Sequence, residues 1–569
     1  MAAYTSVKSG DWNDVAVWSS GFPIAGDTFT ISSNHTIFVR GIEACASGTC
    51  NGNLKINDNC PLTLSGNLTV VGSANNGTVT LYPSSSLKFS GTDRQFIFNG
   101  TAANPVSLVS VSAGPNNRPY FGGATNTDNV YFISSTGLSY DRLMSFNCSY
   151  VDFRYVFDTV NLYFINNGQH GGTVDNSWYF THCLFDYCGN VRYGSGSTPG
   201  GDVQIKLVNC DFRHPKHTQW IDYTAAIAIN PEVVKFVDCT FSGTSVGEEF
   251  RITNGSTGAN DILVSGCIFE DTFYNNLGGY PVTADFVHWY NAYVGSNQNC
   301  YNTSNPGGWM VNDSVMYSTV ANAHMCTENG TAPTSANTWQ DNILYASDSA
   351  ANLFGFNRPI TMQRNTTIGG NGCVSTSTNA GTVDITRHTH IHKTANFDTT
   401  LLFETSNFTG TVNFTSSILY GIANAAEHVI NSIAAAQTLG RIGYNCNYNV
   451  GGTVYNNVSI TTDNTGNDIT SNPLFNNVDV TIAAWDTSLG GAGTVSNAFA
   501  EMLKLNGFAR DATPATFNPA YSKSALLTYL RSGFTPRNRA LKQTGYLSVD
   551  IGSQAYNPLP PKNTMLGLG

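Results

Sequence analysis

The chain has 569 residues and a net charge of −11, with charged residues at 11% and aromatic residues at 12%. Lys and Arg form no cluster that could neutralise phosphates, so we expect no nucleic-acid binding. No apolar stretch reaches the roughly 18 residues of a membrane span, and the N-terminus has no apolar signal region. We therefore expect no membrane insertion and no secretory signal.

The first 110 residues contain short segments in which apolar and polar residues alternate, as in half-buried strands. They are Leu54–Ile56, Leu62–Leu64, Leu68–Val71, Val79–Leu81 and Leu87–Phe89. Their close spacing predicts an N-terminal segment, 1–110, made of an entry turn and short opening coils.

A three-residue phrase, Cys-x-Phe/Tyr, recurs farther along the chain. It begins at Cys148, Cys183, Cys210, Cys239, Cys267 and Cys446, and the first five are 35, 27, 29 and 28 residues apart. Residues i and i+2 of a strand share a face, so each phrase is expected to place a thiol and a ring on one inward face. Strand-like segments precede three of the phrases, at 203–208, 233–237 and 261–264.

A repeat of this length predicts stacked supersecondary units. Because the segments are strand-like and turn residues interrupt them every few positions, we expect an all-β fold, a right-handed parallel β-helix over 111–490 with about 28 residues per coil. Related phrases end at Tyr317, Tyr345 and Tyr420, the first two again 28 residues apart. A β-sandwich with chance repetition is the alternative, but it gives no reason for like residues at a fixed long period.

The segment 491–569 has a different pattern and is expected to cap or attach the β-helix. Apolar residues at helical spacing predict short helices at 497–505 and 522–531, the first followed by Gly507 as a C-cap. The residues after Pro558 are expected to be extended.

The 13 cysteines are expected to be mostly free, buried thiols, because the chain has no signal for export to an oxidising compartment. Cys45, Cys50 and Cys60 form the one tight group, for which a metal site or a late disulfide is the alternative to simple packing.

Ser9–Trp18 near the N-terminus resembles a segment of many right-handed β-helix proteins, and Leu530–Leu541 near the C-terminus resembles a segment of bacteriophage virion β-helix proteins of the tailspike, fibre or head-surface type. Ser9–Trp18, followed by Pro23–Asp27 and Thr28–Ile31, resembles the entry turn in which paired tryptophans cover the first coil. Asn472–Phe475 resembles a final coil, and Leu530–Leu541 with Val549–Gly552 resembles a terminal segment. The resemblance implies a virion protein made in the host cytoplasm, a homotrimer, and contacts with other virion proteins and a host cell-surface glycan.

Three histidines alternate at His388, His390 and His392 and are expected on one face of one strand. Imidazoles bind transition metals, and the stretch resembles the His-x-His pairs with which phage fibre tips hold iron between three chains. Same-face residues lie about 6.5 to 7 Å apart, so one ion cannot reach all three. An exposed polar strand or a contact between the chains of a trimer is the alternative to a metal site.

A second cluster contains His214, His217, Trp220 and Asp222, which could form a sugar site with the indole stacked on a sugar ring. The alternative is a solvated turn with a half-buried tryptophan.

The densest acidic region supplies candidate catalytic carboxylates at Glu249, Glu270 and Asp271. Cleavage of a glycosidic bond needs two carboxyl groups about 5 to 9.5 Å apart, which adjacent coils could offer. The alternative is ordinary turn carboxylates that keep the protein soluble.

Three functions follow from these patterns. The first is a virion structural protein whose rigid β-helix binds host surface glycan, with no required cofactor. The second is a glycan depolymerase that uses carboxylates of the region 248–288. The third is an architectural decoration protein without a ligand.

Overall fold

The fold was analysed in a computed structural model of residues 1–569. The described residues are 1–100, 104–111, 114, 116–134, 144–159, 163–167, 177–194, 204–214, 216, 219–225, 234–237, 239–242, 249–254, 262–270, 274–278, 282–290, 301–303, 310–312, 315–318, 326–328, 337–346, 352–356, 359–368, 372–376, 381–392, 400–405, 410–421, 428–432, 437–475 and 551–552.

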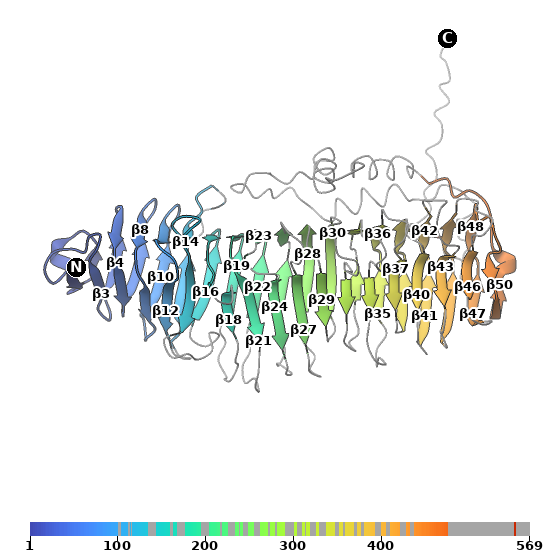
Figure 1. The fold of residues 1–569 in the computed structure, drawn as a ribbon, viewed down its shortest axis with the longest axis horizontal. Coiled ribbons are helices and arrows are strands. Elements are labelled where there is room, and N and C mark those ends of the chain that lie inside the picture. The colour runs from blue at the N-terminus through green and yellow to red at the C-terminus, as the bar shows by residue number, and fades with distance from the viewer. Residues whose placement is uncertain are drawn as a thin grey trace, which may run out of the picture. The chain divides into compact units, whose positions relative to one another are not determined.

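Within these residues the chain is all-β, as the sequence predicts. The helical elements described are two short 3-10 turns, η1 (Val15–Val17) and η3 (Thr465–Asn467). The named strands pair in parallel, as the arrows of Figure 1 show.

The chain forms two compact units. Unit 1 comprises Met1–Thr283 with Asp511–Asn518, and unit 2 comprises Ala284–Arg510 with Pro519–Gly569. The expected division into 1–110, 111–490 and 491–569 stays a prediction, because most of the last segment lies outside the described residues. The helices expected at 497–505 and 522–531 also lie outside them.

Unit 1 contains four rows of parallel strands, and neighbours within a row are hydrogen-bonded. Row A holds β2 (Gly10–Asp11), β4 (Thr36–Val39), β7 (Asn53–Ile56), β10 (Thr78–Leu81), β13 (Val106–Ser110), β16 (Met144–Ser149), β19 (Ser177–Thr181), β22 (Gln204–Val208), β25 (Val234–Val237) and β28 (Ile262–Glu270). Row B holds β5 (Glu43–Cys45), β8 (Pro61–Leu64), β11 (Ser86–Phe89), β14 (Tyr120–Gly123), β17 (Asp152–Arg154), β20 (Leu184–Asp186), β23 (Asp211–Arg213) and β26 (Thr240–Ser242). Row C holds β1 (Ala3–Thr5), β3 (Thr28–Ile31), β6 (Ser47–Cys50), β9 (Leu68–Val71), β12 (Arg94–Asn99) and β15 (Val130–Ser134). Row D holds β18 (Tyr163–Asn167), β21 (Asn190–Gly194), β24 (Gln219–Ala225), β27 (Glu249–Asn254) and β29 (Tyr274–Gly278).

Unit 2 contains three such rows. Row E holds β32 (Met310–Asn312), β35 (Asn337–Gln340), β38 (Ile360–Gln363), β41 (Thr382–Thr386), β44 (Thr411–Thr415), β47 (Gln437–Gly443) and β50 (Val458–Asn464). Row F holds β30 (Val282–Tyr290), β33 (Val315–Ser318), β36 (Ile343–Ala346), β39 (Thr366–Ile368), β42 (Thr389–Ile391), β45 (Ile418–Tyr420) and β48 (Cys446–Tyr448). Row G holds β31 (Tyr301–Thr303), β34 (Cys326–Glu328), β37 (Asn352–Phe356), β40 (Gly372–Thr376), β43 (Thr400–Thr405), β46 (His428–Ser432) and β49 (Tyr455–Asn456).

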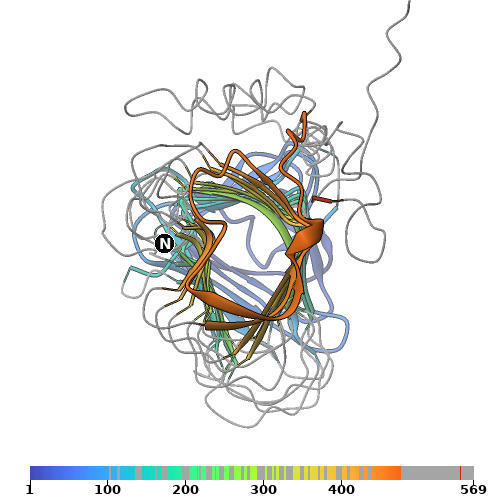
Figure 2. The ribbon, with the colours of Figure 1, turned by 90° about the vertical axis from the view of Figure 1, so that its right-hand side faces the viewer.

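Along most of the chain, successive strands belong to successive rows, and every third strand returns to the same row. Thus β10 pairs with β13, β11 with β14, and β12 with β15. Figure 2 shows the last strands of unit 2 on the sides of a closed outline. A return to the same row after three strands places equivalent residues of successive repeats side by side.

Alternation of apolar and polar residues sets which face of each strand is buried. In Thr36–Val39, Ile37 and Val39 are fully buried while the residues between them are partly exposed. The five short strands expected in the first 110 residues are all present, as β7, β8, β9, β10 and β11. The three segments expected before the cysteine phrases are also present, as β22, β25 and β28.

Two tryptophans of the N-terminal turn pack against strand β3. Trp12 and Trp18 are buried and lie edge-on to each other and to Phe29. Trp12 Nε1 donates to the carbonyl oxygen of Pro23 at 3.1 Å, which ties the indole to the turn before β3.

A corner separates row A from row B, and a left-handed residue occupies it. Tyr150, His182 and Asn209 have φ of 61°, 55° and 52°. Non-glycine residues rarely adopt this conformation, so the surrounding contacts must stabilise it. Each of the three backbone N–H groups donates to the next repeat, for example from His182 to the carbonyl oxygen of Val208 at 2.8 Å.

The residue after the corner builds the predicted thiol ladder in unit 1. Cys183, Cys210, Cys239 and Cys267 occupy equivalent positions in successive repeats and are buried. Each of the last three thiols donates to a carbonyl oxygen of the preceding repeat at 3.4 Å. Burial raises the pKa of the first three thiols well above the usual range, which makes them poor nucleophiles.

The predicted ring ladder follows two residues later. Phe153, Phe185, Phe212 and Phe241 stack nearly parallel, with successive ring centroids 5.2, 4.4 and 4.7 Å apart. This stacking fills the inner side of row B.

Two of the predicted phrases do not join these ladders, and the prediction is wrong for them. Cys148 lies in register with Phe180, and Val151 occupies the ladder position before Phe153. Cys446 lies in register with Ile418 in unit 2. The phrase is therefore equivalent in four successive repeats, whereas Cys148 precedes the left-handed Tyr150 by two residues and Cys446 follows the left-handed Tyr444 by two.

The structure describes the side chains of ten of the 13 cysteines, and all ten are buried thiols that form no disulfide, as expected. In the tight group, the thiols of Cys45, Cys50 and Cys60 each donate to a backbone carbonyl oxygen. Burial raises the pKa of Cys45 and Cys50 to about 12. These observations favour packing over a disulfide or a metal site.

Residues near the C-terminus pack on row F of unit 2. Ile551 is fully buried against Ile418 and Cys446. The Gly552 N–H donates to the carbonyl oxygen of Ser416 at 2.8 Å. Part of the apolar outer surface of β45 and β48 is thus covered by Ile551.

Candidate functional site

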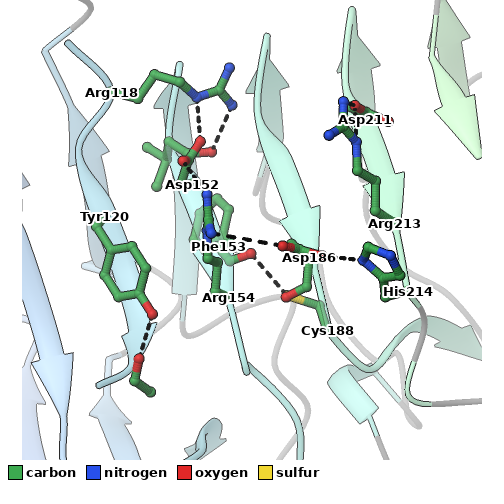
Figure 3. A network of polar contacts seen from close by, with 12 residues as sticks. Arg118, Tyr120, Asp152, Phe153, Arg154, Asp186, Cys188, Asp211, Arg213 and His214 are labelled. Atoms are coloured by element: carbon green, nitrogen blue, oxygen red, sulfur yellow. Dashed lines mark hydrogen bonds and ion pairs between the residues drawn. The ribbon is translucent and has the colours of Figure 1, made fainter. Parts of the chain in front are cut away.

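The outer side of row B in unit 1 carries an unusual density of charge. Because the phenylalanines of β17, β20 and β23 point inward, the residues on either side of each ring point outward. Figure 3 shows these side chains along three neighbouring strands.

The outward charges alternate in sign and bind one another across the strands. Arg118 forms an ion pair with Asp152, which also accepts from Arg154 Nη2 at 3.2 Å. Arg154 Nη1 lies 3.9 Å from Asp186 Oδ2, and Asp186 Oδ1 lies 2.8 Å from His214 Nδ1. We call these five residues the ion ladder.

Burial decides how the ion ladder is held. Asp186 is 4% exposed, so its charge needs partners, and Arg154 and His214 supply them from both sides. Burial acts to lower the pKa of Arg154, but Asp152 and Asp186 outweigh this effect and the pKa is raised. The guanidinium therefore stays charged.

A row of stacked rings runs beside the ion ladder. Tyr155, Tyr187 and His214 directly follow β17, β20 and β23, and each has a left-handed backbone with φ of 56°, 51° and 48°. Their ring centroids are 5.4 and 4.6 Å apart, with interplanar angles of 19° and 13°. The amine of Lys216 lies 5.3 Å from the centroid of Tyr187. We call these four residues the ring row.

The ring row is accessible to solvent, whereas Asp152, Arg118 and Asp186 of the ion ladder are largely buried. Tyr155 and Tyr187 are partly exposed, the His214 side chain is 38% exposed, and Lys216 is exposed. Each ring stacks on the next, so the ring faces are occupied and the ring edges are left to contact a ligand. Two phenol hydroxyls, an imidazole nitrogen and an amine are available beside them. Such a set binds sugar hydroxyls by hydrogen bonds and covers C–H surfaces with ring edges.

The predicted sugar cluster is divided by the structure. His214 belongs to both the ion ladder and the ring row, while His217 lies outside the described residues. Trp220 and Asp222 lie on β24 in row D, where Asp222 is in register with Arg192 and Arg251. One of the four predicted residues is therefore placed at the candidate site.

The sequence interpretation missed Asp152, Asp186, Tyr155 and Tyr187. A signal for them exists in the chain. The phrase Asp-Phe-Arg occurs at 152–154 and 211–213, each time followed by an aromatic residue, and Phe-Asp-Tyr occurs at 185–187 between them. Charge flanking a buried ring, with a second ring next along the chain, marks the outer face of these repeats.

The predicted catalytic carboxylates are not neighbours in strand register. Glu249 lies on β27 in row D, opposite Gln219 and Tyr274. Glu270 ends β28, opposite Ser242 of row B. Asp271 lies outside the described residues, so a catalytic role for these groups stays a prediction.

The three histidines of 388–392 are buried, which corrects the expectation of an exposed polar strand or a contact between chains. His388 and His390 are fully buried and His392 is 6% exposed. Thr367 Oγ1 lies 2.9 Å from both His388 Nε2 and His390 Nδ1, so one hydroxyl bridges two rings. His390 and His392 have their ring centroids 6.4 Å apart.

Burial keeps the imidazoles of His388 and His390 neutral. It lowers the pKa of His388 to about 3, and burial together with the two neighbouring histidines lowers that of His390 well below its usual value. Among the residues that the structure describes, no group of three or more His, Cys, Asp or Glu side chains could hold a metal ion. The transition metal expected at this strand therefore has no geometric support in those residues.

His388 belongs to a polar version of the corner ladder. The residue after the left-handed corner is Asn342, Asn365, His388, Ser417 and Asn445 in successive repeats of unit 2. Asn342 Nδ2 donates to Asn365 Oδ1 at 2.9 Å, and the His388 N–H donates to Ser417 Oγ at 2.9 Å. Hydrogen bonds between repeats thus replace the thiol packing of unit 1.

The chain matches no protein-family model, no curated protein and no solved structure at a significant level. No helix among the described residues has the length and apolar character needed to cross a membrane.

Proposed function

We propose that this chain is a right-handed parallel β-helix that serves as a non-catalytic structural protein and binds a glycan on the outer face of unit 1. Two observations support the fold. Strands return to the same row after three strands, and they pair in parallel. Parallel strands joined by a crossover connect in the right-handed sense in about 98% of cases.

The ring row is the observation that carries the binding role. The rings of Tyr155, Tyr187 and His214 lie on three successive repeats and are partly exposed, and the exposed Lys216 amine of the last repeat lies over the Tyr187 ring. A polymer of repeating sugar units is the kind of ligand that a repeating row of polar ring edges fits. The buried ion ladder holds the row in place, because His214 is tied to Asp186.

The proposed setting is the surface of a virion, with other virion proteins as partners and a homotrimer as the assembly. Its support is the resemblance of the chain ends, in which Trp12 and Trp18 pack on Phe29 and Ile551 packs on row F.

Binding of the purified chain to a panel of bacterial surface polysaccharides tests the proposal. The Tyr187→Ala variant should lose at least about tenfold in affinity, since it removes the central ring and the contact with the Lys216 amine. Tyr82→Ala is the matched control, because Tyr82 is a partly buried tyrosine of unit 1 outside the ring row. Equal affinities of the two variants would contradict the assigned site.

The same panel separates the enzymatic alternative. A structural binder releases no new reducing ends or unsaturated sugars during prolonged incubation. Product release that persists in Tyr187→Ala would contradict the non-catalytic role and would favour a depolymerase.

A further inference from the structure

Two lysines lie side by side on the outer face of row A in unit 1. Lys206 of β22 is in direct register with Lys235 of β25, and Tyr179 of β19 precedes them in the same line. Neighbouring strands are about 4.8 Å apart, so the two amines leave the sheet from adjacent positions.

Both lysine side chains point away from the interior. Leu207 and Phe236, the next residues along each strand, are buried, while Lys206 is exposed and Lys235 is partly exposed. Alternation along a strand therefore places the lysines on the outer side.

The two neighbouring positive charges of Lys206 and Lys235 repel each other. Like charges directly opposite each other on neighbouring strands destabilise a sheet. Within the described part of the chain, no carboxylate forms an ion pair with Lys206 or Lys235. The aspartates of row B are occupied by arginines and by His214. An external anion would compensate the two amines.

The same repeat presents a third amine beyond the corner. Lys216 follows β23 and lies over the rings of Phe157 and Tyr187. In contrast, Arg213 of that strand is neutralised by Asp211, with Nε at 2.6 Å from Oδ2. The uncompensated cations of this region thus lie on both sides of the corner, on a chain whose net charge is −11.

We propose that the ligand of unit 1 is an acidic polysaccharide, whose carboxylate, sulfate or phosphate groups are held by Lys206 and Lys235 beside Tyr179. This inference rests on the proposed glycan-binding function and names the class of ligand. The attraction is local and opposed by the net charge of the chain, so binding weakens steeply as salt screens the amines.

The test compares neutral and acidic polysaccharides, with polygalacturonate, dextran sulfate and a bacterial teichoic acid as the carboxylate, sulfate and phosphate probes. The double variant Lys206→Gln, Lys235→Gln should bind the acidic ligand at least about tenfold more weakly and show a shallower salt dependence. Lys55→Gln, Lys88→Gln is the matched control, because it removes the same charge from two lysines of unit 1 that lie over Phe38 and Tyr120.

Each outcome decides a separate point. Acidic-glycan binding that only the first double variant loses supports the inference, and the probe that binds best identifies the anionic group. Binding of neutral glycans that survives the double variant overturns the acidic ligand and leaves the proposed function standing. Failure to bind any glycan overturns both. Equal losses in the two double variants, or equally tight binding of a single-stranded oligonucleotide, overturn a specific acidic-glycan site.

Discussion

Removal of one ring from the inner ladder is expected to destabilise unit 1 strongly. Phe212 is 3% exposed and stacks on Phe185 at 4.4 Å and on Phe241 at 4.7 Å. Phe212→Ala leaves a cavity between two rings that the strands hold in place, so it should cost about 3 to 5 kcal/mol. Each lost ring contact contributes about 0.5 to 1.5 kcal/mol, which places the expected cost in the upper half of that range.

Urea unfolding of the full chain measures this cost, with hydrogen exchange of the β22 and β23 amides as the local readout. Lys206→Ala in the same repeat is the control and should change the free energy of unfolding by less than about 0.5 kcal/mol, because its side chain is exposed. A double-mutant cycle with Phe241→Ala should give a coupling of about 0.5 to 1.5 kcal/mol. A cost of Phe212→Ala below about 1 kcal/mol, or no coupling, would refute the stacked core.

Two further predictions concern unit 2. The pKa of His388 and the pKa of His390 are lowered in the folded chain, so the unfolded chain binds more protons than the folded chain below about pH 6.5. The free energy of unfolding should therefore fall as the pH decreases, by about 1.4 kcal/mol per pH unit for each histidine. Urea unfolding between pH 7 and pH 5 measures the slope, and His390→Gln should reduce it; an unchanged slope would contradict the assignment. Gly552 has φ of 101°, and an added Cβ would lie 2.5 Å from Ile418 Cδ1. Gly552→Ala should therefore lower the free energy of unfolding by about 1 to 3 kcal/mol and expose the C-terminal segment to proteases. Gly466→Ala, where a Cβ meets nothing within 4 Å, should be neutral, and equal protease sensitivity of the two variants would exclude the C-terminal contact.

Much of the fold could be predicted because each repeat is locally encoded. The alternation in short segments such as Leu54–Ile56 gave the strands, and the intervals between Cys183, Cys210, Cys239 and Cys267 gave the stacking. Both signals depend only on residues within one repeat and its neighbour, so no distant contact can alter them.

The sequence predictions were wrong where a residue pattern does not define the strand register or which face of the strand is buried. Cys148 and Cys446 carry the same phrase as the ladder cysteines, but they lie at other positions relative to the left-handed residues Tyr150 and Tyr444. Alternation of His388 and His390 predicts a shared face without saying whether that face is inside. Their burial depends on the hydroxyl of Thr367 in the preceding repeat, which no local pattern reveals.

The candidate site was only partly predictable for a related reason. Tyr155 and Tyr187 adopt a left-handed backbone, and tyrosine gives no signal for that conformation. Hydrogen bonds from the N–H groups of Tyr155 and Tyr187 to the next repeat and the stacking of neighbouring rings stabilise it, and both exist only once the repeats are assembled.

Cross-linking of register partners tests the central claim most directly. In-register residues on neighbouring strands are about 4.8 Å apart, within the range of a disulfide, whereas a shift of two residues gives about 8 Å. Lys206→Cys, Lys235→Cys should therefore form a disulfide rapidly in the folded chain, and Lys206→Cys, Val237→Cys should not. Equal or reversed yields in the two pairs would contradict the parallel, in-register stacking on which the fold and both binding proposals depend.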